Sequence, residues 1–251
     1  MNEKEYARMY SEEENHWWYA GMRSIVLSLL PPAAVSGQSR VLDAGCGTGY
    51  NLRWLRDNYY ARTTGLDLYS RALAFSQARG EQQLVRADAS TLPFRSETFD
   101  LVTIFDVLSH IDGEEARLRA LRELHRVLRP GGRVLLRVAA FEWLRGSHDD
   151  DVRTYHRYSR GELSATLVMA GFDLARLTFA NCLLFPAAVA WRLMKKAHMA
   201  SVGSDVRPAT RGTKWINSLF RSLLEVEASI LRKPRFSFPV GLSLIALARK
   251  P

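Results

Sequence analysis

Residues 40–49 read RVLDAGCGTG, a short apolar segment that runs directly into a loop with three glycines. Residues 40–44 have the length and composition of a buried strand, and helix-forming residues follow from 50 to 58. In an open α/β sheet, ligands bind beyond the carboxyl ends of the strands, which is where this order places the loop. The glycine loop is therefore the first candidate ligand site.

Two acidic residues frame the glycine loop. Asp43 lies just before it, and Asp67 ends the next strand-like segment, residues 63–67. A carboxylate at the end of the second strand can accept hydrogen bonds from both ribose hydroxyls of a nucleoside. The glycine spacing is G-x-G-x-G rather than the G-x-G-x-x-G of dinucleotide sites, and the preceding carboxylate suits a cationic ligand better than a pyrophosphate. The pattern predicts a nucleoside-containing cofactor and disfavours nicotinamide oxidoreduction.

Strand-like and helical segments alternate along the rest of the chain. The strand-like runs are residues 84–88, 99–105, 133–139, 172–178 and 240–248, and the helical ones are 70–79, 113–128 and 159–170, with a turn at 129–132. This alternation predicts an α/β fold, a Rossmann-like, mostly parallel, seven-stranded sheet with helices on both faces. We expect the last two strands to pair with each other.

We expect a single domain over residues 1–251, with additions before and within the sheet. Residues 6–30 look helical, so residues 1–37 are predicted to form an N-terminal helical cap. The cofactor-binding core follows at 38–180. Residues 181–238 are longer than a compact connection requires and predict a C-terminal helical insertion, with the last strand in 239–251.

The composition narrows the class of protein. Only Cys46 and Cys182 are present among 251 residues, so we predict neither a disulfide framework nor a metal site. The acidic N-terminal segment does not resemble a secretory signal, which makes the cytoplasm the expected location. The apolar stretch at residues 177–191 is shorter than the roughly 20 residues that span a bilayer.

The positive charge is concentrated in the C-terminal region. The net charge is +9, and residues 192–251 carry 12 Lys and Arg against 3 Asp and Glu, which accounts for the whole excess. Such a region is either a solvated face or a contact surface for nucleic acid or anionic lipid. Basic, aromatic and apolar residues together are also typical of a segment that lies on a membrane surface.

Several further motifs occur in a fixed order. They are residues 87–89 with 92–94 (ADA and LPF), residues 99–106 (FDLVTIFD) and residues 121–132 (LRELHRVLRPGG). With the glycine loop, they resemble the class I S-adenosylmethionine-dependent methyltransferases, most closely the type 11 small-molecule branch, over about residues 38–175. The resemblance implies S-adenosylmethionine as the cofactor and S-adenosylhomocysteine as its product.

The resemblance also implies roles for individual residues. The methionine portion of the cofactor would contact Asp43, Gly45, Cys46, Gly47 and Gly49, the ribose Asp67 and Leu68, the adenine Asp88 and Ala89, and the sulfonium side Phe105 and Asp106. Cys46 is expected to pack beneath the cofactor rather than to act as a nucleophile. His110 and His125 are expected to be packing residues.

The acceptor pocket is expected just after the fifth strand, at residues 148–160. There His148 or His156 would remove a proton from a hydroxyl, and Arg157 and Tyr158 would orient a polar or anionic acceptor, unless the segment is a solvated loop before a helix. Near the N-terminus, Trp18, Tyr19 and Arg23 are candidates for a lid over the cleft, the alternative being that these residues pin the helix to the core.

The leading functional prediction is methyl transfer to a small-molecule acceptor, at an oxygen atom, with an amphipathic or lipid-linked compound as one possibility. One alternative is methylation of RNA or another nucleic acid, which residues 104–107 (IFDV) disfavour because they lack an Asn/Asp-Pro-Pro-aromatic loop. Another alternative is a non-catalytic scaffold that binds S-adenosylmethionine. Contact with a membrane surface through the basic C-terminal region is a further possibility, and no oligomeric state is indicated.

Overall fold

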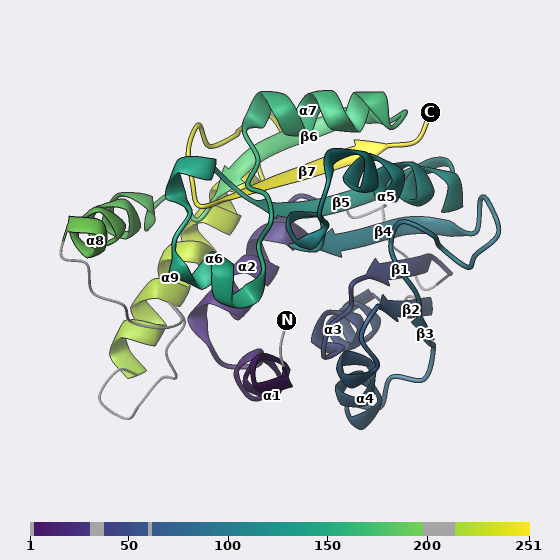
Figure 1. Ribbon diagram of the computed structural model, residues 1–251, viewed down its shortest axis with the longest axis horizontal. Coiled ribbons are helices and arrows are strands. Elements are labelled where there is room, and N and C mark those ends of the chain that lie inside the picture. The colour runs from purple at the N-terminus through teal and green to yellow at the C-terminus, as the bar shows by residue number, and fades with distance from the viewer. Residues whose placement is uncertain (1–2, 31–37, 60–61, 198–213) are drawn as a thin grey trace.

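The computed structural model describes residues 3–30, 38–59, 62–197 and 214–251 (Figure 1). Residues 31–37 of the predicted cap and 198–213 of the predicted insertion lie outside the described residues, as does the side chain of His148. The described residues form one seven-stranded sheet in the order β3-β2-β1-β4-β5-β7-β6.

The helices and strands follow one another along the chain as predicted in outline. The strands are β1 (Arg40–Ala44), β2 (Arg62–Asp67), β3 (Leu84–Arg86), β4 (Phe99–Phe105), β5 (Leu128–Ala139), β6 (Asp173–Ala180) and β7 (Ser243–Arg249). The helices are α1 (Glu3–Glu12), α2 (Trp17–Ser28), α3 (Tyr50–Tyr59), α4 (Ser70–Ala78), α5 (Glu114–Val127), α6 (Ser147–Val152), α7 (Arg160–Met169), α8 (Phe185–Ala197) and α9 (Lys214–Leu231). Short 3-10 turns lie at Leu108–His110 and Glu142–Leu144.

The sheet is mostly parallel. Strands β1 to β5 pair in parallel, and β7 lies antiparallel between β5 and β6. This arrangement confirms the predicted Rossmann-like α/β fold. In its central register Val41 lies opposite both Thr63 and Leu101, so the carboxyl ends of β1, β2 and β4 meet at one edge of the sheet.

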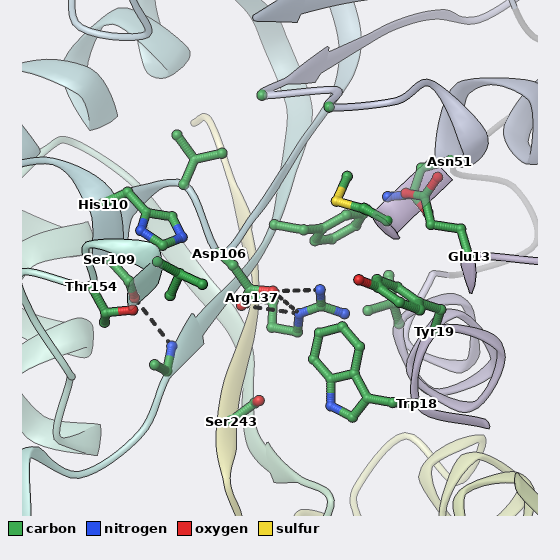
Figure 2. Close-up of a pocket in the computed structure, with 18 of the residues that line it drawn as sticks. Glu13, Trp18, Tyr19, Asn51, Asp106, Ser109, His110, Arg137, Thr154 and Ser243 are labelled. Carbon is green, nitrogen blue, oxygen red and sulfur yellow. Dashed lines mark hydrogen bonds and ion pairs between the residues drawn. The ribbon is translucent and has the colours of Figure 1, made fainter. Parts of the chain in front are cut away.

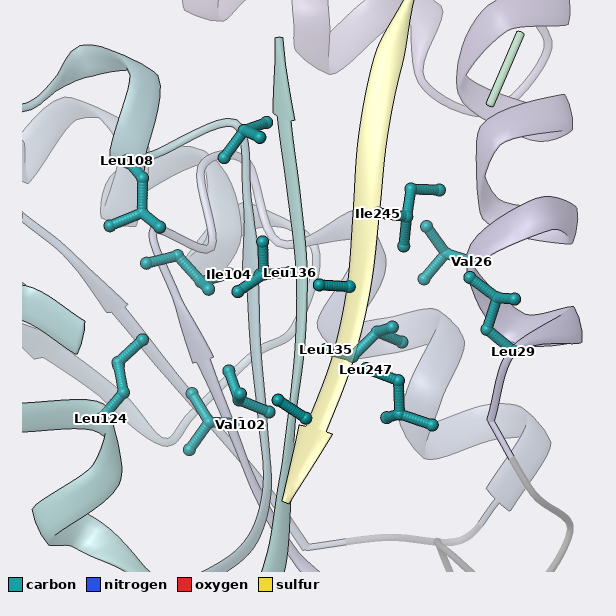
Figure 3. Close-up of a cluster of buried hydrophobic side chains, with 14 of the residues drawn as sticks. Val26, Leu29, Val102, Ile104, Leu108, Leu124, Leu135, Leu136, Ile245 and Leu247 are labelled. Atoms are coloured by element: carbon teal, nitrogen blue, oxygen red, sulfur yellow. The ribbon is translucent and has the colours of Figure 1, made fainter. Parts of the chain in front are cut away.

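Apolar side chains cover both faces of the sheet. Val26 of α2 and Leu29, which caps the end of that helix, pack on Ile245 and Leu247 of β7, whereas Leu124 of α5 lies on the opposite face (Figure 3). Burying each such side chain contributes about 1.5–3 kcal/mol, so the two helix layers hold the sheet rigidly beneath the ligand edge.

The N-terminal cap is two helices, not the single helix predicted over residues 6–30. α1 ends at Glu12, and α2 begins at Trp17, where the His16 side chain caps the new helix by accepting a hydrogen bond from the Trp18 amide at 3.3 Å. The turn between them sends α1 toward α4 and leaves α2 packed against α9 (Figure 1). The helix-forming sequence of residues 6–30 therefore did not reveal the break between Glu12 and Trp17.

Strand β5 starts earlier than predicted. Residues 129–132, expected as a turn, are paired into the sheet edge: the Gly131 amide donates to the Lys250 carbonyl, and the Lys250 amide donates to the Gly132 carbonyl, both at 2.9 Å. Gly131 has a φ of +78°, a value typical of a turn, so the turn predicted from Pro-Gly-Gly exists as an irregularity within the strand.

Candidate active site

A large cavity opens at the carboxyl ends of β1, β2 and β4. Its volume is about 1800 Å³, well above the roughly 300–1,000 Å³ of a pocket for one drug-sized ligand. One part is lined by the glycine loop and the ends of β2 and β4, and the other by α2, α8, α9 and the α6 segment. The volume accommodates a cofactor and a separate acceptor.

Most of the predicted cofactor residues line this cavity. They are Gly45, Cys46, Gly47, Asp67, Leu68, Asp88, Ala89, Phe105 and Asp106. Asp43, in β1, and Gly49, the last glycine of the loop, do not line it. The residues predicted to bind the cofactor are therefore brought together on one side of the cavity.

The backbone conformation of the glycine loop leaves no room for side chains at its glycines. Gly45 has a φ of +84°, and a Cβ there would lie 2.1 Å from Val107 Cγ2. Gly47 has a φ of +56°, and its amide donates to Asp67 Oδ2 at 3.0 Å. Asp67 also accepts from the Tyr69 amide at 2.9 Å, so its carboxylate joins the loop to the end of β2. The loop thus exposes backbone to the cavity.

Asp43 is a buried carboxyl with one unused oxygen. Its Oδ1 accepts from the Thr103 hydroxyl at 2.6 Å, and its Oδ2 has no hydrogen-bond partner among the described residues. Burial, opposed by the Thr103 hydrogen bond, raises the pKa of Asp43 from 3.8 to about 6. A cationic group in the cavity would stabilise the ionised form.

The Cys46 thiol is buried under the loop and lies 3.9 Å from Ser76 Oγ. Burial and the nearby Asp43 carboxyl raise the pKa of this thiol well above its ordinary value. A protonated, buried thiol is a poor nucleophile. This environment agrees with the expected packing role.

Glu13, which the sequence analysis did not single out, also reaches the cavity. It lies in the turn between α1 and α2, accepts a hydrogen bond from the Thr48 hydroxyl of the glycine loop and pairs with Arg79 at 3.0 Å. Burial raises the pKa of Glu13 to about 7, against the lowering effect of Thr48 and Arg79. The N-terminal cap is thereby tied to the glycine loop.

The predicted lid residues do lie over the cavity. Trp18, Tyr19 and Arg23 all line it, and Figure 2 shows Trp18 and Tyr19 facing the site from α2. Arg23 lies over the Tyr50 ring at 4.2 Å and donates to the Glu13 carbonyl at 2.7 Å. These contacts hold α2 against the cofactor end of the cavity.

An arginine at the centre of the cavity was missed by the sequence analysis. Arg137 of β5 pairs with Asp106, with Nη2–Oδ2 at 2.5 Å and Nε–Oδ2 at 3.0 Å, and its guanidinium lies 4.8 Å from the Trp18 ring (Figure 2). Asp106 adopts a φ of +62°, and its amide donates to the Arg137 carbonyl at 2.8 Å. The third guanidinium nitrogen, Nη1, makes no hydrogen bond to the described residues. Nη1 is therefore the guanidinium nitrogen that remains to donate to a ligand in the cavity.

Polar groups form the wall next to Arg137. Ser109, His110, Thr154 and Ser243 line the cavity there (Figure 2). His110, expected to be a packing residue, lies on this wall and its Nδ1 is 3.0 Å from the Arg153 carbonyl. His125 does pack, with its ring 5.0 Å from that of Phe172.

The structure corrects two of the acceptor assignments. His156 does not line the cavity; its Nε2 lies 2.5 Å from Glu162 Oε1, because Glu162 belongs to the capping box that starts α7. Tyr158 is 1% exposed and also lies outside the cavity. Arg157 lines it, but the guanidinium is buried and paired with Asp149 at 2.8 Å, so it anchors the α6 segment. The backbone of His148 lies in α6.

The far end of the cavity is apolar. It is lined there by Trp17, Leu184, Trp191, Met194, Ile216 and Phe220. Asn217 of α9 accepts from the Trp17 amide at 2.8 Å and donates to the Asn15 carbonyl at 3.1 Å, which fixes α9 beside the cap. Within the described residues no cluster of three His, Cys, Asp or Glu side chains is arranged to hold a metal, and no helix is long and apolar enough to cross a bilayer.

Comparison with known proteins gives consistent matches. Residues 42–136 match the family described as methyltransferase domain. The chain is 38% identical over 116 residues to a tRNA (carboxymethyluridine(34)-5-O)-methyltransferase of Arabidopsis thaliana, covering 46% of this chain and 26% of the relative. It is 42% identical over 97 residues to a malonyl-[acyl-carrier protein] O-methyltransferase of Enterobacter lignolyticus, covering 38% and 36%.

Solved structures extend the likeness over the whole fold. A methyltransferase of Haloferax volcanii, solved in complex with the Trm112 methyltransferase activator, superposes with a TM-score of 0.63 at 22% identity and covers 98% of this chain and 94% of that one. At that identity the likeness concerns the fold alone. The chain spans between a quarter and about a third of the length of the two curated relatives above, so those matches concern the cofactor-binding core.

Proposed function

We propose that this chain, which matches a methyltransferase domain over residues 42–136, uses S-adenosylmethionine to methylate an oxygen atom of a small anionic acceptor that Arg137 holds. The guanidinium of Arg137, fixed by Asp106 and open to the cavity at Nη1, is the observation that carries this proposal. A carboxylate is the acceptor group that fits it best, because a guanidinium and a carboxylate match in charge and shape.

The residues present fit the cofactor. Glycine backbone faces the cavity where a Cβ at Gly47 would meet Met9 Cε at 2.5 Å, and the buried Asp43 carboxyl has an oxygen without a partner among the described residues. When bound, S-adenosylmethionine supplies an electrophilic methyl group on a sulfonium and leaves as S-adenosylhomocysteine. A cationic ligand would favour the ionised forms of Asp43 and Glu13, whose pKa values burial raises, and Asp67 and Asp88 line the cavity and offer acceptors for its nucleoside.

The catalytic demand on the protein is then mainly one of positioning. A carboxylate oxygen is already ionised at neutral pH, since carboxyl groups ordinarily titrate near pH 4. No side chain has to remove a proton, and alignment with exclusion of water supplies the rate increase. Trp18 and Tyr19 cover the site, and Arg137 fixes the acceptor oxygen. This chemistry needs no general base, which agrees with the position of His156 outside the cavity lining.

The relatives support an oxygen acceptor of this kind. Malonyl and carboxymethyl groups, which appear in the names of the two curated relatives, each end in a carboxyl group, and both relatives are named as O-methyltransferases. The apolar end of the cavity, around Trp191 and Phe220, provides space for the remainder of an amphipathic acceptor.

The proposal is tested by methyl transfer from radiolabelled S-adenosylmethionine to a panel of mono- and dicarboxylic acids of increasing chain length. Arg137→Gln should lower kcat/KM at least about 100-fold while S-adenosylhomocysteine binding persists, because a buried charge-assisted contact contributes about 3 kcal/mol. Arg133→Gln, on the same strand but away from the cavity, is the matched control. The double variant Arg137→Gln/Asp106→Asn removes both charges and checks that an unpaired Asp106 is not the cause. Unchanged turnover in both Arg137 variants would exclude this role.

A second candidate is methylation of tRNA. The sequence disfavoured nucleic acid as a partner, but a tRNA methyltransferase among the relatives and the 12 basic residues in 192–251 give that acceptor support. Total tRNA therefore belongs in the same assay. Labelled tRNA with unlabelled carboxylic acids would replace the small-molecule proposal, and cofactor binding without transfer to any acceptor would favour the scaffold alternative.

A further inference from the structure

Helices α8 and α9 expose large apolar side chains. We define the α8–α9 surface by six residues that are each more than 40% exposed: Leu183, two residues before α8, Trp191 and Met194 of α8, and Trp215, Leu219 and Val226 of α9. In Figure 1 α8 stands away from the sheet, and α9 runs along α2. Exposed apolar side chains concentrated on two neighbouring helices indicate a contact surface rather than scattered surface residues.

The exposed residues of α9 lie on the side away from the core. The inner side is occupied by Leu224, Ala228 and Leu231, all buried in the core. Trp215 and Leu219, four residues apart, share an outward face because residues at this spacing neighbour one another on a helix. The outer side of α9 therefore carries an apolar stripe of Trp215, Leu219 and Val226 between exposed polar residues, among them Ser218 and Ser222.

The charge around this surface is positive. Lys214 at the start of α9 is exposed, as are Arg232 and Lys233 just beyond its end. Of the acidic residues on α9, Glu227 is fully buried and accepts from the Leu183 amide at 2.7 Å, and the exposed Glu225 is paired with Arg221 at 2.8 Å, so neither adds unpaired negative charge to the surface. A partner that complements the surface must offer both apolar and anionic groups.

We propose that the α8–α9 surface binds the face of an anionic lipid membrane. Lipid acyl chains accept Trp, Leu, Met and Val side chains together, and anionic headgroups attract the basic residues around them. A single-stranded nucleic acid binds by stacking its bases on aromatic rings, so the aliphatic side chains of Leu219 and Val226 would contribute little to its binding. The described helices are too short and too polar to span the bilayer, so the contact is peripheral.

The surface is continuous with the cavity. Trp191 and Met194 are exposed and also line the apolar end of the cavity, next to Ile216 and Phe220 of α9. Docking in this orientation places that end of the cavity at the membrane, from which an acceptor with a lipid tail would enter. This second step rests on the proposed function, whereas the docking does not.

The experiment measures sedimentation of the full chain with phosphatidylcholine vesicles and with vesicles that contain phosphatidylglycerol as well. We expect binding only to the anionic vesicles. Trp215→Ser/Leu219→Ser should weaken it at least about tenfold, since each large side chain contributes about 1.5–3 kcal/mol when buried. Both residues lie outside the cavity lining. Val168→Ser/Met169→Ser on α7 is the matched control, because these residues are equally exposed, at 61% and 53%.

Calorimetric binding of S-adenosylhomocysteine shows that each variant is folded. Vesicle sedimentation does not depend on methyl transfer, so it tests membrane docking separately from the proposed activity. Absence of wild-type binding to anionic vesicles would overturn the proposal, as would equal loss in the α7 control. Binding of tRNA that the Trp215 and Leu219 variant weakens, without vesicle binding by the wild type, would assign the surface to RNA instead.

Discussion

Replacing Asp43 with asparagine should change how the free energy of unfolding depends on pH. Asp43 is buried, and its pKa is raised from 3.8 to about 6 in the folded, ligand-free protein. A raised carboxyl pKa means that the folded state favours the protonated form. The contribution of Asp43 to the free energy of unfolding is therefore most favourable below about pH 3.8, falls as the pH rises toward 6, and stays at its lowest value above that.

The size of the effect follows from the pKa change. Two units between the unfolded and folded states correspond to about 3 kcal/mol, of which about 2 kcal/mol falls between pH 4.5 and pH 7.5. In Asp43→Asn this contribution is absent. The amide in the variant adds an unsatisfied donor where Oδ2 now lies, but that cost is the same at each pH and cancels from the slope.

The assay is urea unfolding of ligand-free protein, followed by tryptophan fluorescence at several pH values. The wild type should lose about 2 kcal/mol relative to Asp43→Asn across that interval. Asp173→Asn, at an exposed position on β6, controls for the loss of one carboxylate. Parallel pH profiles for the wild type and Asp43→Asn would refute the reasoning that burial keeps this carboxyl partly protonated.

Two further predictions concern the loop and the α6 segment. Gly47→Ala should weaken S-adenosylhomocysteine binding about tenfold or more in a calorimetric titration, because its φ of +56° is a conformation that costs an alanine about 1–2 kcal/mol; an unchanged Kd would contradict this geometry. Asp149→Asn should lower the free energy of unfolding by about 3–5 kcal/mol, since it leaves the buried Arg157 guanidinium unpaired, and a loss below about 1 kcal/mol would show that the pair is not structural.

The sequence predicted the cofactor end of the cavity far better than the acceptor end. The glycine loop and Asp67 are local signals: each follows a strand directly, and the topology of a parallel sheet brings the strand ends together. The role of Arg137 could not be predicted because it lies within the apolar run of β5, and only its ion pair with Asp106 shows that its side chain faces the cavity. Glu13 was hidden because its contact to Thr48 joins segments 35 residues apart.

His156 and Tyr158 were misassigned for a different reason. They lie in a polar segment after the fifth strand, and polarity alone does not say which side of the backbone faces the cavity. Tertiary contacts determine where these side chains point: His156 pairs with Glu162, and Tyr158 packs in the hydrophobic core. The start of β5 and the break between α1 and α2 were missed because both depend on pairing with distant segments, Lys250 in the first case and α9 in the second.

The position of β7 has a consequence for the order in which the molecule can assemble. β6 pairs with β7 and not with β5, although β7 is made more than sixty residues later. While the chain is being synthesised, β5 is an open sheet edge and β6 has no place in the sheet until residues 243–249 have left the ribosome. A chaperone or an aggregation partner would meet this half-built edge, and shortening the chain before Ser243 would leave it permanently unfilled.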